Sequence, residues 1–393
     1  MDHPHGGRHR ILCQPRHPRR QQRFLTAARR LLTRALSMSS TPCHHRHPRA
    51  DHKAARVAAR AAILAIGLGT AAMAQAQTST LETVRQRGFV KCGVNAGLPG
   101  FSQSDDLGTW RGLDADYCKA IAAAVLGDPT KVNFVPTPRL NRFSSLRSGE
   151  IDVLVRNTTW TSERDSAGGL SFVGVNYYDG QGFLVKASRG LKSVKELNGA
   201  AICVGSGTTS ELNLAGFFKA HNMAYTPVTF ANYEDTVRAY LADRCAAYTA
   251  DVSSLYSVRV KQVRPKDHVL LPEIISKEPL GPSVRQGDAQ WFTIVKWVHF
   301  VLLNAEELSV TQANVDAMAT SPDPDVRRLV GMDGNFGSGL GLANDFAVQV
   351  IKAVGNYGEI FERNLGSGSR LKIARGLNNL WSHGGLQYAP PIR

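Results

Sequence analysis

The segment RNTTWTSER at residues 156–164 brings together side chains that suit a small charged ligand. It follows the apolar run Ile151–Val155, so its first residues are expected at the carboxyl end of a buried strand. Thr161 can then cap a helix whose third residue is Arg164. Hydroxyls, an amide, helix-start N–H groups and a guanidinium would face one crevice, which suits a carboxylate beside an ammonium. The alternative, which this segment alone favours, is a surface helix with a solvated arginine.

Two further segments follow predicted strands. Gly205-Ser-Gly-Thr-Thr209 is a turn between strand Ala200–Val204 and a helix, and its backbone N–H groups suit an anion. It is no phosphate loop, because no Lys follows it and the GxGxxG spacing is absent. Asp251 follows strand Ala246–Ala250, where a carboxylate could accept a hydrogen bond from an ammonium. Singly, the turn is equally typical of a helix cap, and Asp251 is more typical of one. Together with Arg164 they match the backbone groups of an α-amino acid.

Hydrolytic chemistry has little support in the sequence. The histidines beyond residue 76 are His221, His268, His299 and His383. None lies in a Ser/His/Asp or Cys/His pattern, and neither GxSxG nor HExxH occurs. No CxxC or regular Cys/His spacing indicates zinc, so we expect neither a cofactor nor a metal.

Strands and helices are predicted to alternate from residue 77 onward. The predicted strands are Phe89–Val94, Val132–Val135, Ile151–Val155, Ala200–Val204, Val228–Phe230 and Ala246–Ala250. The predicted helices are Asp114–Leu126, Asn141–Ser148, Lys192–Leu197, Glu211–His221, Asn232–Ala242 and Trp291–Leu303. This alternation predicts an α/β fold whose lobes are open, mostly parallel sheets flanked by helices. Such sheets bind ligands at the carboxyl ends of their strands, where the three candidate segments are expected.

We expect four parts along the chain. Residues 1–76 form a leader, 77–183 the first part of lobe 1, 184–282 lobe 2, and 283–393 a return to lobe 1 with a C-terminal helical extension. A lobe that is interrupted by another requires at least two crossing strands, which is a hinge geometry.

The net charge of +15 invites a nucleic-acid interpretation, but its distribution argues against one. Residues 1–76 carry 14 Lys or Arg and 2 Asp or Glu, whereas the rest carries 33 and 30. The basic character therefore belongs to the leader and not to a folded surface, and no nucleic-acid partner is expected.

The end of the leader has the pattern of a secretory signal peptide. A basic segment at 38–60 precedes the apolar run Ala61–Met73 and the A-x-A sequence Ala74-Gln75-Ala76. The apolar run is too short to span a bilayer. Met38 is a more sensible start than Met1, and the product is expected to be exported.

Four cysteines follow the leader: Cys92, Cys118, Cys203 and Cys245. Export favours pairing, and proximity along the chain favours Cys92 with Cys118 and Cys203 with Cys245. Buried free thiols remain the alternative.

The chain beyond about residue 80 resembles a periplasmic amino-acid-binding protein of a polar amino-acid ABC importer, of the general L-amino-acid subfamily. The motifs that carry the resemblance are Cys92-Gly-Val-Asn-Ala-Gly-Leu-Pro-Gly-Phe-Ser102, Gly112-Leu-Asp-Ala-Asp116, Arg142-Phe143, Ser148-Gly-Glu-Ile-Asp152, RNTTWTSERD at 156–165, Tyr177-Tyr-Asp-Gly-Gln-Gly-Phe183, Gly207-Thr-Thr-Ser-Glu-Leu212 and Lys277-Glu-Pro-Leu-Gly-Pro282. The resemblance implies a type II, two-lobe, hinge-bending binding fold, not an enzyme. It also implies a periplasmic location in a Gram-negative bacterium.

By position, Arg164 resembles the family's carboxylate-clamping arginine, and Asp251 resembles its ammonium acceptor. Thr159 resembles a hydroxyl residue that touches both ligand ends, and Thr209 resembles an amide donor to the carboxylate. The resemblance places two asparagines nearby, Asn157 and Asn95.

Smaller family members often carry an aromatic residue where Leu98 stands. The absence of an aromatic ring at this position removes one contact that would hold the ligand side chain, and this favours broad specificity.

The resemblance implies capture of an L-amino acid between the lobes. Ligand binding draws Thr208, Thr209 and Asp251 towards Arg164, and closure shifts the population because only the closed form satisfies both ligand charges. A monomer is expected to deliver the ligand to inner-membrane ABC permease subunits. Two alternatives share the fold: a periplasmic dehydratase acting on an arogenate-like amino acid, with Glu163 or Glu211 as its acid, and an extracellular amino-acid sensor partner.

Overall fold

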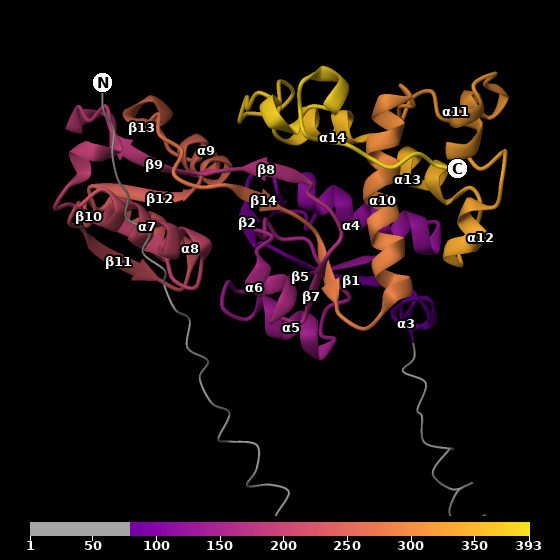
Figure 1. Cartoon of the computed structure of the whole chain (residues 1–393), viewed down its shortest axis with the longest axis horizontal. Helices are drawn as coiled ribbons and strands as arrows, with labels where there is room; N and C mark the ends of the chain where they lie inside the picture. The colour runs from indigo at the N-terminus through magenta and orange to yellow at the C-terminus, as the bar shows by residue number, and fades with distance from the viewer. Residues whose placement is uncertain (1–78) are drawn as a thin grey trace, which may run out of the picture. The chain divides into compact units, whose positions relative to one another are not determined.

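The computed structural model describes residues 79–393, and the predicted signal peptide and start site lie outside the described residues. Gln77–Arg393 form one compact unit, which contains two five-stranded sheets (Figure 1). Among the described residues, none of the helices combines the length and apolarity needed to cross a bilayer.

The first sheet has the strand order β5-β1-β6-β15-β7. Its strands are β5 (Val132–Pro136), β1 (Val90–Val94), β6 (Val153–Leu154), β15 (Ser283–Arg285) and β7 (Leu170–Phe172). The strands β5, β1 and β6 are parallel, and β15 runs antiparallel to both of its neighbours. β6 is shorter than the predicted strand 151–155, but the N–H groups of Asp152 and Val155 still donate to carbonyls of β1.

The second sheet repeats this pattern of directions, with the order β11-β10-β12-β9-β13. Its strands are β11 (Thr226–Phe230), β10 (Ala201–Gly205), β12 (Ala247–Asp251), β9 (Gln181–Lys186) and β13 (His268–Leu270). β11, β10 and β12 are parallel, and β9 runs antiparallel to β12 and β13. The prediction of two open, mostly parallel sheets is therefore confirmed, with one reversed strand in each.

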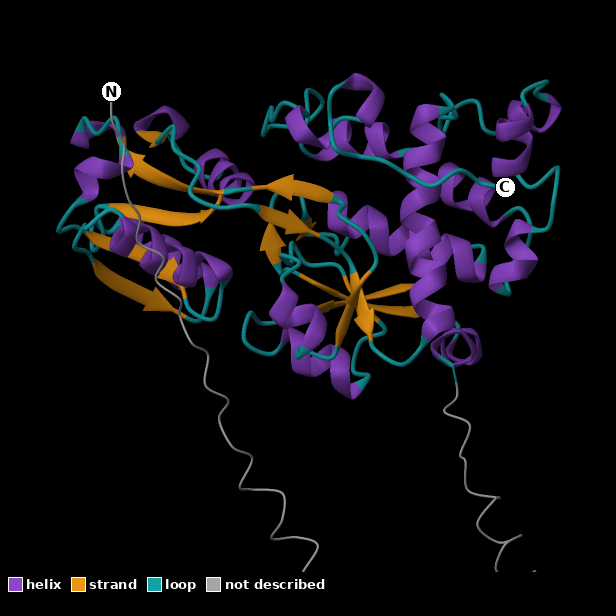
Figure 2. Ribbon diagram, in the orientation of Figure 1, coloured by secondary structure: helices purple, strands orange, loops and turns teal. Residues whose placement is uncertain are grey.

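The two sheets are joined through a ribbon of two crossing strands, which we call the hinge ribbon. Strands β8 (Tyr177–Asp179) and β14 (Glu278–Leu280) pair antiparallel, and each is followed by the reversed strand of the sheet that it enters. Figure 2 shows this pair between the two groups of strands. The expected boundary at 183/184 falls inside β9, all of which pairs in the second sheet, so we place the first crossing at Gly180. β15 begins at Ser283, the residue at which the return was expected.

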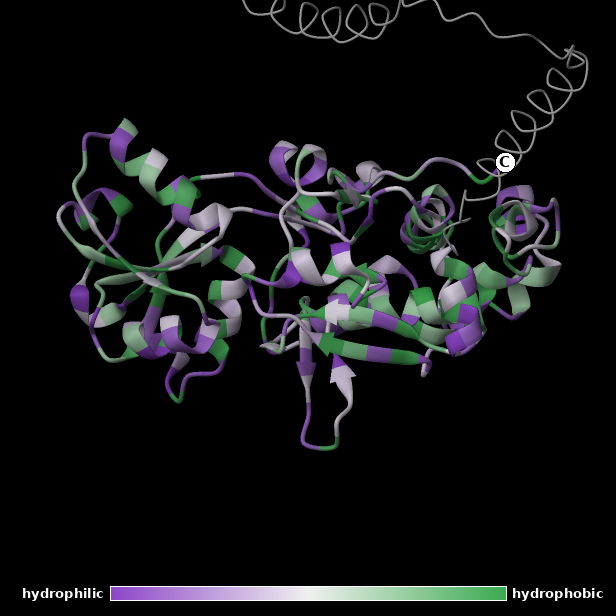
Figure 3. Ribbon diagram, turned by 90° about the horizontal axis from the view of Figure 1, so that it is seen from below, coloured by the Kyte–Doolittle hydropathy of each residue, from purple (hydrophilic) through white to green (hydrophobic). Residues whose placement is uncertain are grey.

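Helices cover the sheets as the alternation predicts. In the order of the chain they are α3 (Thr80–Arg87), α4 (Leu113–Leu126), α5 (Arg142–Ser148), α6 (Ser162–Ser166), α7 (Thr209–Ala220), α8 (Tyr233–Leu241), α9 (Val252–Val260), α10 (Ala289–Glu307), α11 (Pro324–Leu329), α12 (Phe336–Leu340), α13 (Phe346–Val354) and α14 (Tyr357–Asn364). The 3₁₀ helices are η2 (Ala187–Arg189), η3 (Val194–Leu197), η4 (Pro265–Asp267), η5 (Ala317–Thr320), η6 (Gly376–Asn378) and η7 (Trp381–His383). In Figure 3 the helices carry alternating hydrophobic and hydrophilic bands, which is typical of helices with one buried face.

A short three-stranded sheet and a glycine position the start of α4. The sheet contains β2 (Gly97–Leu98), β3 (Ser102–Ser104) and β4 (Trp110–Arg111), and it leads directly to Gly112. Gly112 has a φ of 126°, and a Cβ there would lie 2.1 Å from the carbonyl oxygen of Phe101. Only glycine fits this position, which explains the glycine before the buried helix α4.

The main hydrophobic core joins the two ends of the described chain. It includes Leu81, Val153 and Val284 together with Leu371 and Ile392. Residues beyond β15 therefore pack on the first sheet and not on the second, which has its own clusters.

The four described cysteines form two disulfides. Cys92 bonds to Cys118 across 26 residues and Cys203 bonds to Cys245 across 42, which is the pairing that chain proximity favours. Each bond ties a central strand to a neighbouring segment, since Cys92 lies in β1 and Cys203 in β10.

We expect the double variant Cys203→Ala/Cys245→Ala to lose about 2–4 kcal/mol of unfolding free energy, because the 42-residue loop is no longer closed in the unfolded chain. Urea unfolding followed by fluorescence measures this loss. An unchanged urea midpoint with an unchanged slope would show that the bond does not form in the native protein.

Candidate functional site

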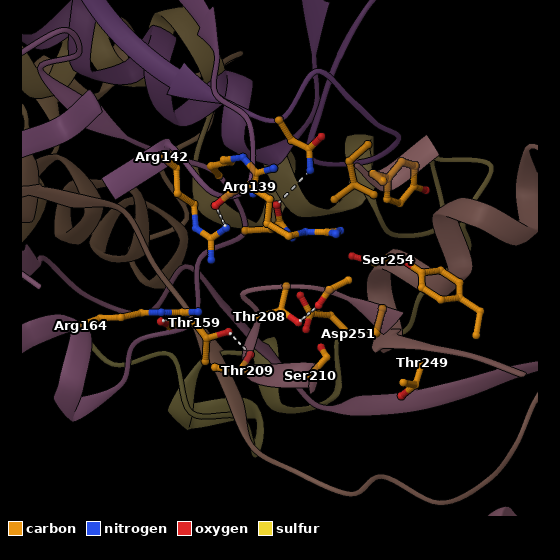
Figure 4. Close-up of a pocket in the computed structure, with 18 residues that line it drawn as sticks. Arg139, Arg142, Thr159, Arg164, Thr208, Thr209, Ser210, Thr249, Asp251 and Ser254 are labelled. Carbon is orange, nitrogen blue, oxygen red and sulfur yellow. Dashed lines mark hydrogen bonds between the residues drawn. The ribbon is translucent and has the colours of Figure 1, made fainter. Parts of the chain in front are cut away.

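A polar cavity lies where strands of both sheets end. Its walls come from the first lobe (Asn95, Leu98, Arg139, Arg142, Arg156, Asn157, Thr159, Arg164) and from the second (Gly205, Thr208, Thr209, Ser210, Tyr233, Tyr248, Thr249, Ala250, Asp251, Ser254). All seven residues that the sequence nominated for ligand binding are in this set. Figure 4 shows Arg139 and Arg142 on one side of the cavity, with Thr208, Thr209 and Asp251 opposite them.

Arg164 is held at the cavity by its own helix and by an aromatic ring. Thr161 caps α6, and its hydroxyl accepts a hydrogen bond from the Arg164 N–H at 3.3 Å. The Arg164 guanidinium donates to the carbonyl oxygen of Thr159 at 2.7 Å and lies over the ring of Phe143, 5.2 Å from its centroid. Burial lowers the pKa of Arg164, and the carboxylates of Glu278 and Asp251 oppose that shift. The alternative of a freely solvated arginine is wrong.

The turn before α7 serves partly as the helix cap that was its alternative interpretation. The Thr208 hydroxyl accepts from the Glu211 N–H at 3.2 Å and donates to the Gly205 carbonyl at 2.7 Å. α7 then begins at Thr209, whose N–H, like those of the next residues, has no acceptor within the helix. The N–H groups at this helix start can meet an anion, while the Thr208 side chain is already engaged.

Asp251 occupies the N-cap position of α9, yet its side chain makes no capping hydrogen bond. The interpretation of Asp251 as a plain cap is therefore wrong. Its carboxyl group is buried at the cavity wall with 9% of the residue exposed. Burial raises the pKa of Asp251 well above its ordinary value, and the neighbouring Asp179 and Glu278 add to the shift. The ionised form of such a carboxyl group is strongly stabilised when a cation binds beside it.

Two asparagines connect the first lobe to Asp251. The Asn95 amide donates to the Asn157 side-chain oxygen at 3.4 Å, and the Asn157 N–H donates to Asp114 at 2.9 Å. Asn157 has a φ of 34°, a left-handed conformation that asparagine tolerates better than most residues. Its amide also lowers the pKa of Asp251 by hydrogen bonding, against the effect of burial.

Glu278 is a site residue that sequence reasoning missed. It is 1% exposed, and its carboxylate accepts from the hydroxyl of Thr159 at 2.6 Å and from that of Thr209 at 2.9 Å. Because each hydroxyl has one hydrogen, both threonines are left with only lone pairs for a ligand. With its hydrogen directed to Glu278, the Thr159 hydroxyl can accept from an ammonium, and donation to a carboxylate requires it to turn away from Glu278. The contact of Thr159 with both ligand ends stays a prediction.

The hinge ribbon brings a second carboxyl group beside Glu278. Asp179 of β8 is the register partner of Glu278 on β14, and it accepts from the Gly180 N–H at 2.8 Å and from the Ser253 hydroxyl. Burial, together with the charge of Glu278, raises the pKa of Asp179 to about 7 against these hydrogen bonds. Like charges on directly opposed residues of two strands repel, which favours the protonated form of Asp179.

Three further arginines were not nominated for the site. Arg139 and Arg142 follow strand β5, and Arg156 follows β6, where burial lowers its pKa to about 10. The Arg142 guanidinium donates to the Arg139 carbonyl at 2.5 Å and lies over Phe143, 4.4 Å from the ring centroid. The signal that could have revealed them is their position after the carboxyl end of a strand.

The two glutamates considered as the acid of the dehydratase alternative lie outside the cavity. Glu163 is exposed, and Glu211 accepts from the Gly207 N–H at 2.9 Å; neither lines the cavity. His299 and His268 bond to the hydroxyls of Tyr117 and Tyr240 at 2.9 and 2.8 Å. These histidine contacts are structural, so neither the two glutamates nor the two histidines place an acid at the cavity.

Comparison with known proteins identifies the family. Residues 90–315 match the family model of the bacterial extracellular solute-binding proteins, family 3. The chain is 58% identical over 335 residues to the general L-amino acid-binding periplasmic protein AapJ of Rhizobium johnstonii, which covers 85% of this chain and 97% of that relative. It is 52% identical over 329 residues to the glutamate/glutamine/aspartate/asparagine-binding protein BztA of Rhodobacter capsulatus, with 84% and 97% covered.

A solved relative has the same fold. The ABC transporter periplasmic binding protein of Brucella ovis, determined with glutathione bound, is 56% identical and superposes with a TM-score of 0.79. The match covers 80% of this chain and 99% of that chain. The chain therefore belongs to the family 3 extracellular solute-binding proteins, has their type II two-lobe fold, and is a binding protein, not an enzyme.

The raised pKa of Asp179 predicts a pH dependence of stability. A carboxyl group whose pKa is about 7 in the folded state and near 4 when unfolded stabilises the fold below pH 4 and loses that contribution as the pH rises towards 7. In the ligand-free protein we expect Asp179→Asn to flatten the decline in melting temperature between pH 4 and 7. Thermal unfolding followed by circular dichroism measures it, and an equally steep decline in both proteins would refute the assignment.

Proposed function

We propose that this protein captures L-amino acids between its two lobes in the periplasm of a Gram-negative bacterium and delivers them to an ABC importer. The observation that carries the proposal is the position of Arg164 and Asp251 on opposite lobes at one cavity. A guanidinium facing a carboxylate across the cavity matches the carboxylate and ammonium of an α-amino acid.

Each end of the ligand has a defined set of partners in this proposal. The α-carboxylate binds the Arg164 guanidinium and the N–H groups at the start of α7, beginning with Thr209. The α-ammonium donates to Asp251 and to the hydroxyl lone pair of Thr159, which Glu278 keeps directed towards the ligand. Asn157 and Asn95 hold the wall beside Asp251.

The printed names of the relatives support this class of ligand. The Rhizobium relative is named for general L-amino acids and the Rhodobacter relative for four particular ones. The glutathione in the Brucella structure carries a free α-amino and α-carboxyl group on its γ-glutamyl residue. A site that binds the α-amino and α-carboxyl groups can accept the ligands named for all three relatives.

Broad specificity is expected if the site binds mainly the α-ammonium and α-carboxylate that all amino-acid ligands share. Leu98, which is 1% exposed, packs at the cavity wall and offers no polar group to a ligand side chain. The side chain is then tested by shape and by whatever polar groups lie farther from Asp251.

Closure couples binding to delivery. In the open form each lobe presents one charge site, and only the closed form satisfies both ends of the ligand, so the ligand shifts the population towards closure. The closed monomer is proposed to dock on inner-membrane permease subunits, and residues 38–76 are proposed to direct export as a signal peptide. The sensor alternative has no observation of its own to favour it.

We expect Arg164→Ala to lower amino-acid affinity by about two to three and a half decades, because the α-carboxylate of the ligand is then buried without its charged partner. A thermal-shift screen of the wild type with the twenty L-amino acids selects the ligand, and calorimetry measures its affinity for the variant. Arg147→Ala is the matched control, since Arg147 is an exposed arginine outside the cavity. Unchanged affinity in Arg164→Ala, or stabilisation by none of the twenty, would overturn the proposal.

The raised pKa of Asp251 predicts that binding releases protons. A ligand ammonium favours the ionised carboxylate, so affinity should rise with pH until Asp251 is ionised without ligand. Calorimetry in buffers of different ionisation enthalpy measures the released protons. Asp179→Asn removes one neighbouring carboxyl group and should move the window of proton release to lower pH. Proton uptake on binding would contradict the role given to Asp251.

A further inference from the structure

The cavity is lined by more guanidinium groups than the single α-carboxylate of an amino acid can pair with. Four guanidinium groups line it, those of Arg139, Arg142, Arg156 and Arg164, and Asp251 is the one carboxylate among the lining residues. The pKa of Arg142 is lowered by burial and then by the charges of the other three arginines, and Asp251 opposes this shift. The buried carboxylates of Glu278 and Asp114 act on Arg164 and Arg156. A ligand carboxylate on Arg164 still leaves Arg139 and Arg142 without an acceptor on the ligand.

Three buried hydrogen-bond donors at the cavity also have no partner among the described residues. They are Nη1 of Arg139, Nε of Arg142 and the hydroxyl of Tyr233. Arg142 is 4% exposed. A buried donor without an acceptor is destabilising, so three of them around one cavity indicate that an acceptor belongs there.

The residues that carry the three donors line the same cavity. The Arg142 guanidinium bonds to the backbone of Arg139, and the charge of Arg139 lowers the pKa of Tyr233 against the effect of burial. Arg139 reaches across from the first lobe to Gly205 at the end of β10, where a Cβ would stand 2.1 Å from its Nη1. The absent side chain at Gly205 leaves space for this guanidinium at the boundary between the lobes.

From these observations we propose that Arg139, Arg142 and Tyr233 form a second anion subsite, which binds a carboxylate on the ligand beyond its α-carboxylate. A carboxylate has two oxygens with about four acceptor positions, enough for all three donors, and it balances part of the guanidinium excess. The preferred ligands are α-amino acids with a second carboxylate, either on the side chain, as in glutamate, or farther along a γ-glutamyl peptide. The inference rests on the proposed function and narrows it.

Calorimetric titration of the purified protein with L-glutamate, L-glutamine and γ-glutamylglycine tests the subsite. Glutamate and glutamine differ by the exchange of a carboxylate for an amide, so the ratio of their affinities isolates the second charge. We expect a carboxylate ligand to bind about 10- to 100-fold more tightly than glutamine, as is typical of hydrogen bonds to a charged group.

Variants assign that preference to the subsite. In Arg139→Gln and in Tyr233→Phe the preference for the carboxylate ligand should fall about tenfold or more, whereas Arg147→Gln, outside the cavity, should keep it. Gly205→Ala provides an independent variant, because its Cβ displaces the Arg139 guanidinium without altering Arg139 itself. Circular dichroism confirms that each variant is folded.

The outcomes separate this inference from the proposed function. Dependence on Arg139 with glutamate places the second carboxylate on the side chain, and dependence with γ-glutamylglycine alone places it on an extended peptide; either result supports the subsite. Glutamine bound as tightly as both carboxylate ligands, or a preference that Arg139→Gln leaves intact, would overturn the subsite while leaving amino-acid capture in place. Failure of all three ligands and of every other amino acid would overturn both.

Discussion

The cost of burying unpaired charge is the constraint on which the site depends. Asp251 is buried near two other carboxyl groups, Asp179 and Glu278, while the guanidinium of Arg164 lies in the same cavity with burial working against its charge. Neither group is satisfied by a close ion pair with the other in the structure, in which Arg164 bonds instead to a backbone carbonyl. A solute with both charges at the right separation relieves both costs at once, which is how affinity and lobe closure become linked.

The fold places these charges by one repeated device. Each sheet has three neighbouring parallel strands and one reversed strand that enters from the hinge ribbon, so the carboxyl ends of the parallel strands in both lobes border the cavity. Arg139 follows β5, Asn157 follows β6, Thr209 follows β10 and Asp251 ends β12. The hinge contributes Glu278, whose hydrogen bonds join a threonine of each lobe beside the crossing strands.

Some residues of the site could be predicted because their roles follow from neighbouring residues in the sequence. Thr161 and Arg164 were found because a helix cap and the residue three positions later are read within one turn, and the structure has that cap. Glu278 was missed as a site residue because its bonds to Thr159 and Thr209 span 119 and 69 residues and depend on the register of the hinge ribbon. The reversed direction of β9 and β15 was equally hidden, since a buried apolar strand has the same pattern in either direction. Asp251 could not be separated from a plain helix cap until its side chain was seen to make no capping bond.

The central claim is that both charges of an amino acid are required, one for each lobe. Calorimetric titration with L-glutamine, N-acetyl-L-glutamine and L-glutamine α-amide tests it most directly, because each derivative removes one charge and keeps the side chain. The account predicts that each derivative binds at least about 100-fold more weakly than glutamine, since it leaves either Asp251 or Arg164 buried without a partner. A derivative that binds as tightly as glutamine would contradict the account.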